Sequence, residues 1–429
     1  MANKKQLRWL PLDNAAKIYP AARRRNWSNV FRLSATLKEK VDKEALSRAL
    51  DITVKRFPSI AVRLRRGAFW YYLQQLSHAP EIREENCYPL AWMSKKETRK
   101  CALRVIVYKN RIAVEIFHSL TDGNGALVFL KTLLAEYIFQ KYSVSVPAEK
   151  GVLSRLDEPT QEELEDSFLK YAGPINASRR ENTAYKITGT PETAGFLNLT
   201  CFVLNTSQVL DTAHRYNASV TAFLCACLMQ AIQRIQKQEV PNPKKRKPIK
   251  VLIPVNLRKL FKSNTLRNFA MYTTPEILPC LGEYSFEEIL KVISANMAAE
   301  ITPKKMSMRI ATNVNSERIM AVRVMPLFVK NIVMKAIFDT VGEKKSCLTL
   351  SNLGAVDMPN EMKEYVTRLD FILGIQATAP YNCGVISYGE KTYINFIRDI
   401  TEPRLEREFY RVINEFNLDV TVQSNEREG

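Results

Sequence analysis

The N-terminal part of the chain alternates strand-like and helix-like patterns of hydrophobic residues. Residues 29–36, NVFRLSAT, alternate apolar and polar side chains, as a half-buried strand does. Residues 42–57 follow with apolar side chains on one helical face. SIAVRL and FWYYLQ predict a strand pair, and ALRVIVY and RIAVEIF predict a hairpin. Helical spacing then returns over residues 123–138.

The C-terminal part repeats this mixture. A strand is predicted in FLNLTCFVL and an apolar helix in SVTAFLCACLMQAIQRIQ. Further strands are predicted in IKVLIPVN, FAMYTT, SCLTLSNLG, RLDFILGIQ, CGVISYG and TYINFIR, and helices near residues 285–300, 326–338 and 402–416. Between the two parts, residues 145–193 are mostly polar and show no sustained period, apart from a short helix expected near residues 162–171.

These patterns predict an α/β fold of the α+β sandwich type, with mixed sheets flanked by helices. A chain of 429 residues is too long for one ordinary hydrophobic core, so we expect two domains. The predicted boundaries are an N-terminal domain at 1–150, a crossing linker at 151–193 and a C-terminal domain at 194–429.

The charge of the chain is strongly positive, because 63 lysines and arginines outnumber 44 aspartates and glutamates. A net charge of +19 attracts a polyanion, an acidic membrane surface or a phosphorylated ligand, and does not distinguish among them. The densest basic run, NPKKRKPIK at 242–250, has no interleaved aromatic residues that would stack on bases. We therefore expect a solvated loop there, and no nucleic-acid partner.

The eight cysteines show no zinc-ligand spacing, so we expect free thiols, no metal site and a cytoplasmic location. The first residues lack the apolar core of a signal peptide. No apolar stretch reaches the roughly 18 residues of a membrane span. The nearest one, residues 322–338, is interrupted by charges and Pro326, and we interpret it as an amphipathic helix.

The stretch IFHSLTDG places His118 at the end of a predicted strand and Asp122 where the next helix begins. In a purely structural interpretation, Asp122 is a helix N-cap, Gly123 allows a tight helix entry and His118 is a core histidine. In a functional interpretation, the neutral imidazole accepts a proton from a hydroxyl or an amine. No serine or cysteine occupies a nucleophile elbow, so direct attack of the acceptor on a bound acyl donor is the simpler mechanism.

Four stretches resemble the chloramphenicol acetyltransferase-like acyltransferase superfamily. HSLTDG is similar to its His-x-x-x-Asp-Gly signature, and IKVLIPVNLRKLFKSNTLRNFAMYTT to its strand, Pro-Val-Asn-Leu-Arg-like turn and Asn-Phe pair. LTLSNLG at 348–354 and the opening LPLDNAAKIYPA resemble the alcohol acetyltransferase branch. The likeness covers nearly the whole chain, and it is weakest over residues 145–193.

The resemblance implies a role for several residues. His118 would be the general base, and Asp122 would pair with Arg258 to fix the loop. Gly123 would leave space for the thioester of the donor. Ser351 or Asn352 would donate a hydrogen bond to the tetrahedral oxyanion, although a Ser-Asn-Leu-Gly stretch can also be a simple turn.

The resemblance also implies two similar domains with an active-site channel between them. The expected activity is acyl transfer from acyl-coenzyme A, as a co-substrate and not a resident cofactor, to a hydroxyl in a ternary complex. Condensation domains carry a second histidine where Phe117 stands here, and the Asp-Phe-Gly-Trp-Gly stretch of the plant enzymes is missing. Alternatives are an amine acceptor, a donor on a carrier protein, or an inactive basic binding protein. The basic residues at 244–250 are candidates for contact with the phosphates of coenzyme A.

Overall fold

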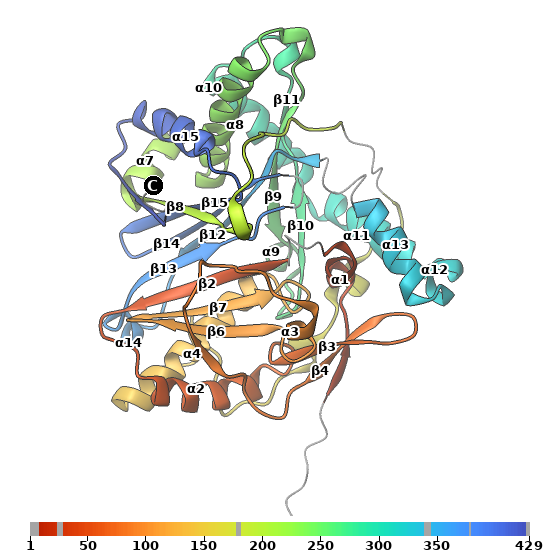
Figure 1. Cartoon of the computed structure of the whole chain (residues 1–429), viewed down its shortest axis with the longest axis vertical. Helices are drawn as coiled ribbons and strands as arrows, with labels where there is room; N and C mark the ends of the chain where they lie inside the picture. Colours follow the sequence, from red (N-terminus) through yellow and green to blue (C-terminus); the bar gives the residue numbers. More distant parts are fainter. Residues whose placement is uncertain (1–7, 24–28, 177–181, 339–344, 377–378, 426–429) are drawn as a thin grey trace, which may run out of the picture.

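The computed structural model describes residues 8–23, 29–176, 182–338, 345–376 and 379–425. Two large sheets form the body of the molecule (Figure 1). The first has the order β13 (Val366–Ile372), β2 (Val30–Leu37), β7 (Arg111–Phe117), β6 (Leu103–Tyr108) and β5 (Ile82–Glu84). The second has the order β10 (Ala270–Thr273), β9 (Ile249–Asn256), β12 (Leu348–Val356), β14 (Tyr381–Tyr388), β15 (Lys391–Arg398), β8 (Asn198–Asn205) and β16 (Val420–Ser424), with β11 (Glu276–Ile277) beside β9.

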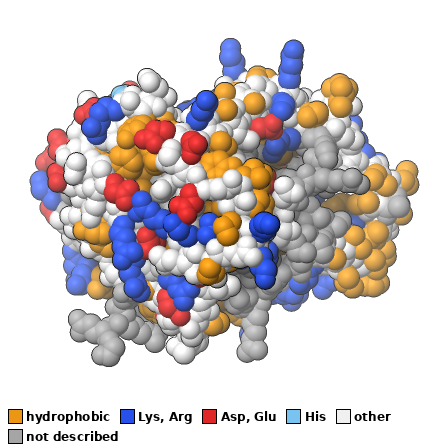
Figure 2. Space-filling model, turned by 90° about the horizontal axis from the view of Figure 1, so that it is seen from above, with side chains coloured by type: hydrophobic (Ala, Val, Ile, Leu, Met, Phe, Trp, Pro, Cys, Tyr) orange, Lys and Arg blue, Asp and Glu red, His pale blue; other side chains and the backbone are white. Residues whose placement is uncertain are grey.

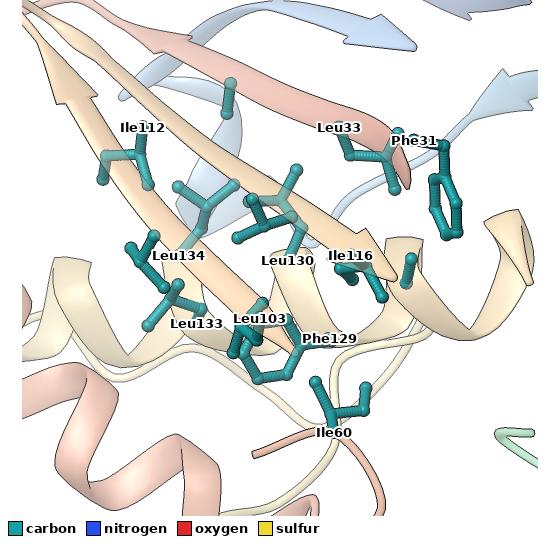
Figure 3. Close-up of a cluster of buried hydrophobic side chains, with 14 of the residues drawn as sticks. Phe31, Leu33, Ile60, Leu103, Ile112, Ile116, Phe129, Leu130, Leu133 and Leu134 are labelled. Carbon is teal, nitrogen blue, oxygen red and sulfur yellow. The ribbon is translucent and has the colours of Figure 1, made fainter. Parts of the chain in front are cut away.

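Helices α2 (Lys43–Arg56) and α4 (Gly123–Tyr142) cover the first sheet, and they pack on each other. Figure 3 shows strand residues such as Leu33 and Ile116 facing Leu130 and Leu134 of α4 across this core. Helix α4 is buried on most sides because its sequence is apolar nearly all round. Its first turn is therefore held rigidly against the end of β7, which it follows in the chain.

The second sheet is covered by α8 (Val220–Glu239), on which α10 (Phe286–Glu300) and α15 (Arg404–Asn414) pack. Cys225 and Cys227 of α8 are fully buried free thiols, as the apolar run around them predicted. None of the eight cysteines forms a disulfide. These three helices complete a second core separate from that of the first sheet.

One strand departs from the simple division into two halves. The chain leaves the second sheet after β12, forms β13 along the edge of β2 in the first sheet, and returns to the second sheet as β14. The domain boundaries remain a prediction, and this exchange of a strand was not predicted from the sequence. Each sheet thus depends on the C-terminal part of the chain.

The segment between the halves contains two short helices, α5 (Gln161–Leu164) and α6 (Ser167–Tyr171), where one helix was predicted. Arg56 of α2 donates two hydrogen bonds of 2.7 Å to the Glu163 carboxylate. On the other side, Ser167 shares a 2.8 Å hydrogen bond with Ser263. The segment therefore contacts both halves.

The remaining elements lie around the two sheets. A small sheet joins β1 (Trp9–Pro11), β4 (Tyr71–Gln75) and β3 (Val62–Arg66). The other α-helices of the described residues are α1 (Ile18–Ala22), α3 (Lys95–Thr98), α7 (Thr206–Arg215), α9 (Arg258–Phe261), α11 (Pro303–Arg318), α12 (Met320–Val324), α13 (Leu327–Ile337) and α14 (Asn360–Lys363). Among the described residues, no single helix is long and apolar enough to cross a membrane; α7 and α8 reach the required length and hydropathy only as a pair bent by 83°.

Candidate active site

His118 comes directly after β7, which ends one residue earlier than the sequence suggested. Its backbone amide donates a 2.9 Å hydrogen bond to the carbonyl of Asn29, beside the start of β2. The imidazole stacks on the ring of Tyr19 in α1 with centroids 4.5 Å apart, and Phe31 of β2 meets it edge-on. The half-buried ring is thus fixed by aromatic contacts from the N-terminal half.

The third contact of this ring comes from the C-terminal half. His118 Nδ1 lies 3.1 Å from Oδ1 of Asn268, a buried residue in the loop before β10. Nδ2 of Asn268 donates to Oδ2 of Asp13 at 3.1 Å, so its Oδ1 is the atom that faces the imidazole as an acceptor. This network assigns the hydrogen of the neutral ring to Nδ1 and leaves Nε2 with a free lone pair.

Asp13 is completely buried. Its Oδ1 accepts a 2.7 Å hydrogen bond from the amide of Ala16, and Arg267 Nε lies 3.6 Å from Oδ2. Burial raises the pKa of Asp13, while Arg267 and the hydrogen bonds from Asn268 and Ala16 act in the opposite direction. Because Asp13 accepts the hydrogen bond from Asn268 Nδ2, it sets the orientation of the Asn268 amide.

The carboxylate of Asp122 caps α4 by accepting a 3.1 Å hydrogen bond from the amide of Gly125. Its Oδ2 also accepts from Arg258 Nη1 at 2.8 Å and from the amide of Phe269 at 2.9 Å. Burial disfavours the charged form, but Arg258 and the two amides outweigh it and hold the pKa of Asp122 below its ordinary value. The pair expected between Asp122 and Arg258 is present, and it anchors the loop after His118.

Arg258 is the first residue of α9, and its guanidinium donates hydrogen bonds to other groups besides Asp122. Its Nε donates to the carbonyl of Thr265 at 2.8 Å, and Nη2 donates to the carbonyl of Arg267. These bonds fix the loop between β9 and β10, in which Asn268 follows ten positions after Arg258. One guanidinium therefore places both the Asp122 loop and the Asn268 amide.

The turn between His118 and α4 is fixed at further points. Ser119 Oγ donates to the carbonyl of Ala16, and Thr121 Oγ1 donates to the carbonyl of Leu266. A Cβ atom at Gly125 would overlap both Thr121 Oγ1 and that Leu266 carbonyl, so only glycine fits. A Cβ atom at Gly123 would lie 2.9 Å from Leu353 Cδ2, so the start of α4 packs closely on β12.

The Ser-Asn-Leu-Gly stretch belongs to the strand β12 and is not a simple turn. Leu353 brings it beside Gly123. Nδ2 of Asn352 donates to Thr221 Oγ1 at 3.1 Å, and its Oδ1 accepts from the amide of Gly354 at 2.7 Å. Asn352 thus ties β12 to α8, and its neighbour Ser351 is half-buried.

The basic run at 242–250 divides into two groups. Arg246 is buried and donates to the carbonyls of Val240 and Pro241, and Lys250 is buried within β9. The other basic residues of the run, Lys244, Lys245 and Lys247, are exposed. No group of three or more histidine, cysteine, aspartate or glutamate side chains that could hold a metal occurs in the described ranges.

Burial lowers the pKa of His118 from its ordinary value, against the raising effects of its own backbone, Asp122, Asn268 and Asp13. The lowered pKa favours the neutral ring. Sequence reasoning assigned no role to Asn268 or Asp13, although both lie in stretches that carried the resemblance, Asn268 in the Asn-Phe pair. It missed them because nothing in a linear sequence shows that residues 255 positions apart share a hydrogen bond.

No protein-family model matches the chain. No curated protein matches it in sequence. Solved structures do match it along nearly its full length. Trichothecene 15-O-acetyltransferase TRI3 from Fusarium sporotrichioides matches with a TM-score of 0.62 and 11% identity, over 97% of this chain and 96% of that chain.

Two further solved structures also match the chain along nearly its full length. TRI101 from F. graminearum, solved with coenzyme A and T-2 mycotoxin, has a TM-score of 0.64 and 11% identity, over 96% and 99% of the two chains. The first condensation domain of the CDA synthetase has a TM-score of 0.58 and 12% identity, over 96% and 95%. The chain has the chloramphenicol acetyltransferase-like fold. The fold predicted from the sequence is therefore confirmed, while the channel between the halves stays a prediction.

We expect Asp122→Asn to destabilise this fold by about 3 kcal/mol, because it leaves the half-buried Arg258 without a counter-charge. Chemical denaturation measures the change in the free energy of unfolding. Asp42→Asn is the matched control, since exposed Asp42 caps α2 through two backbone amides. Asparagine caps helices as well as aspartate does, so the control should change stability little. If the two substitutions changed the free energy of unfolding equally, the ion pair of Asp122 with Arg258 would not have the stabilising role expected here.

Proposed function

We propose that the chain is an acyl-coenzyme A-dependent O-acyltransferase in which His118 acts as the general base. The observation that carries the proposal is the hydrogen bond from Nδ1 to Asn268, which leaves Nε2 as a free base on a fixed ring. Matched structures named as an O-acetyltransferase or solved with coenzyme A support this donor and this acceptor class.

In this mechanism His118 Nε2 accepts the proton of the acceptor hydroxyl while the oxygen attacks the thioester carbonyl. The tetrahedral intermediate collapses to an ester and expels the thiolate of coenzyme A. The thiolate then takes the proton from Nε2, so the base is regenerated. Nearby Asp122 and Asp13 favour the positive charge that forms briefly on the imidazole.

Other residues would assist at defined points. Ser351 would donate a hydrogen bond to the oxyanion, and Asn352 would hold its strand in place. Gly123 would keep the path of the thioester clear. The exposed lysines at 244, 245 and 247 are candidates for the phosphates of coenzyme A, and a cytoplasmic location stays a prediction.

An amine acceptor or a donor on a carrier protein would use the same base. The likeness to a condensation domain supports this second candidate. Phe117 in place of a second histidine favours a hydroxyl acceptor. The hypothesis of an inactive binding protein is weaker, since it does not explain the hydrogen-bond network that joins His118, Asn268 and Asp13.

We expect His118→Ala to lower kcat by about 100- to 10,000-fold while the protein stays folded, because general-base catalysis contributes a factor of that size. The assay incubates the protein with a mixed alcohol and amine library and several acyl-coenzyme A donors, and mass spectrometry identifies the products. His214→Ala is the matched control, because His214 is exposed at the end of α7.

The outcomes separate the candidates. Esters that disappear only in His118→Ala support the proposal, and amides would identify the amine acceptor instead. Equal activity of His118→Ala and the wild type would refute the role of the base. Circular dichroism verifies that both variants are folded.

The acid limb of the kcat/KM profile should have its midpoint below pH 6.5, because burial lowers the pKa of the free base. Asn268→Ala removes a partner that raises this pKa, so its acid limb should move to still lower pH. The variant should also lose about 10- to 100-fold in kcat with little change in KM, as the tautomer is no longer fixed. An unchanged pH profile with a raised KM would instead indicate a role in substrate binding.

A further inference from the structure

Helices α12 and α13 project from one side of the molecule beside the tip of the β3–β4 hairpin (Figure 1). Their outer face is apolar. Met320, Phe328 and Ile332 are 68%, 63% and 68% exposed. Figure 2 shows hydrophobic side chains gathered at the end of the molecule where these helices lie. Exposed apolar side chains that cluster in this way mark a contact surface.

The polar contacts of α13 fix this orientation. Lys330 is 1% exposed; its Nζ donates to the carbonyl of Phe69 at 2.9 Å and lies 3.6 Å from the centre of the Trp70 ring. Asn331 Nδ2 donates to the hydroxyl of Tyr71 at 3.1 Å. The helix therefore turns its polar side inward and its apolar side outward, which is the reverse of an ordinary surface helix.

The hairpin tip extends the same face. The amide of Leu327 donates to the carbonyl of Ala68, so the tip lies directly beside α13. Phe69, next in the chain, is 48% exposed. We call this combined face the α13 surface, and its exposed apolar members are Phe69, Ile319, Met320, Val324, Phe328, Ile332 and Val333.

The segment that forms α12 and α13 is basic. Residues 319–338 contain two lysines and one arginine, and no aspartate or glutamate. Arg323 is exposed on α12, Arg318 is exposed at the end of α11, directly before Ile319, and Arg66 is exposed at the end of β3. An apolar helical face with a basic rim is complementary to a bilayer whose headgroups are negative.

We propose that the α13 surface docks on an anionic lipid membrane. The apolar side chains would enter the boundary between headgroups and acyl chains, and the arginines would contact the headgroups. Docking of this kind is peripheral. It also sets the active site close to lipid, because α13 packs against α1, whose Tyr19 stacks on His118. The proposal rests on the surface and not on the reaction.

The test measures co-sedimentation of the full-length protein with vesicles of phosphatidylcholine alone and with added phosphatidylglycerol. We expect binding to the anionic vesicles and much weaker binding to the neutral ones. Phe328→Ser combined with Ile332→Ser should lower the partition coefficient at least about tenfold, because two large side chains no longer enter the bilayer. Arg323→Glu should weaken the preference for anionic vesicles.

The matched control combines Leu156→Ser with Leu281→Ser, which removes two apolar side chains that are 86% and 76% exposed elsewhere. This variant should bind vesicles like the wild type, and thermal melts verify that all variants are folded.

Three results would overturn the proposal: no vesicle binding, binding that the Phe328 and Ile332 substitutions leave unchanged, or a dimer in sedimentation velocity that those substitutions dissociate. The last result would assign the face to a second copy of the chain. None of these readouts depends on acyl transfer.

Discussion

The ion pair between Asp122 and Arg258 is the contact on which the geometry of the site depends. It joins the first turn of α4, in the N-terminal half, to the loop after β9, in the C-terminal half. Buried ion pairs add little net stability compared with apolar packing, but they permit few alternative arrangements. The loop that Arg258 fixes also carries Asn268. The pair therefore determines where the amide meets His118, although neither charged residue hydrogen-bonds to the imidazole.

The electrostatics around His118 balance two requirements of a general base. Burial keeps the ring neutral before the reaction, because a charge is poorly solvated there. Asp122 and Asp13 lie near enough to favour the cation that forms when Nε2 takes a proton. Asn268 selects the tautomer of the imidazole, since its hydrogen bond to Nδ1 leaves Nε2 as the nitrogen that can accept a proton. The aromatic rings of Tyr19 and Phe31 hold the plane of the imidazole, so little reorientation accompanies proton transfer.

The sequence predicted the parts of this structure that are local. The strand before His118, the cap at Asp122 and most core helices follow from short-range periodicity, and the motif resemblance supplied Arg258. The roles of Asn268 and Asp13 were not predicted, because they come from a contact between distant segments of the chain. For the same reason the pairing of β13 with β2 left no trace in the local pattern. The amphipathic character of residues 322–338 was evident from the sequence. Its inverted orientation was not, because that depends on the buried contacts of Lys330 with the β3–β4 hairpin.

The position of β13 has a consequence for how the chain is made. In the first sheet β2 lies between β7 and β13, and six of its residues, from Arg32 to Leu37, pair with β13. When the ribosome has synthesised only the N-terminal half, that edge of β2 has no partner, and a bare strand edge invites pairing with other chains. The first sheet becomes complete only after residue 372 has emerged. The N-terminal half is thus not a self-sufficient unit, because one edge of its sheet stays open until a strand from the C-terminal half pairs with it.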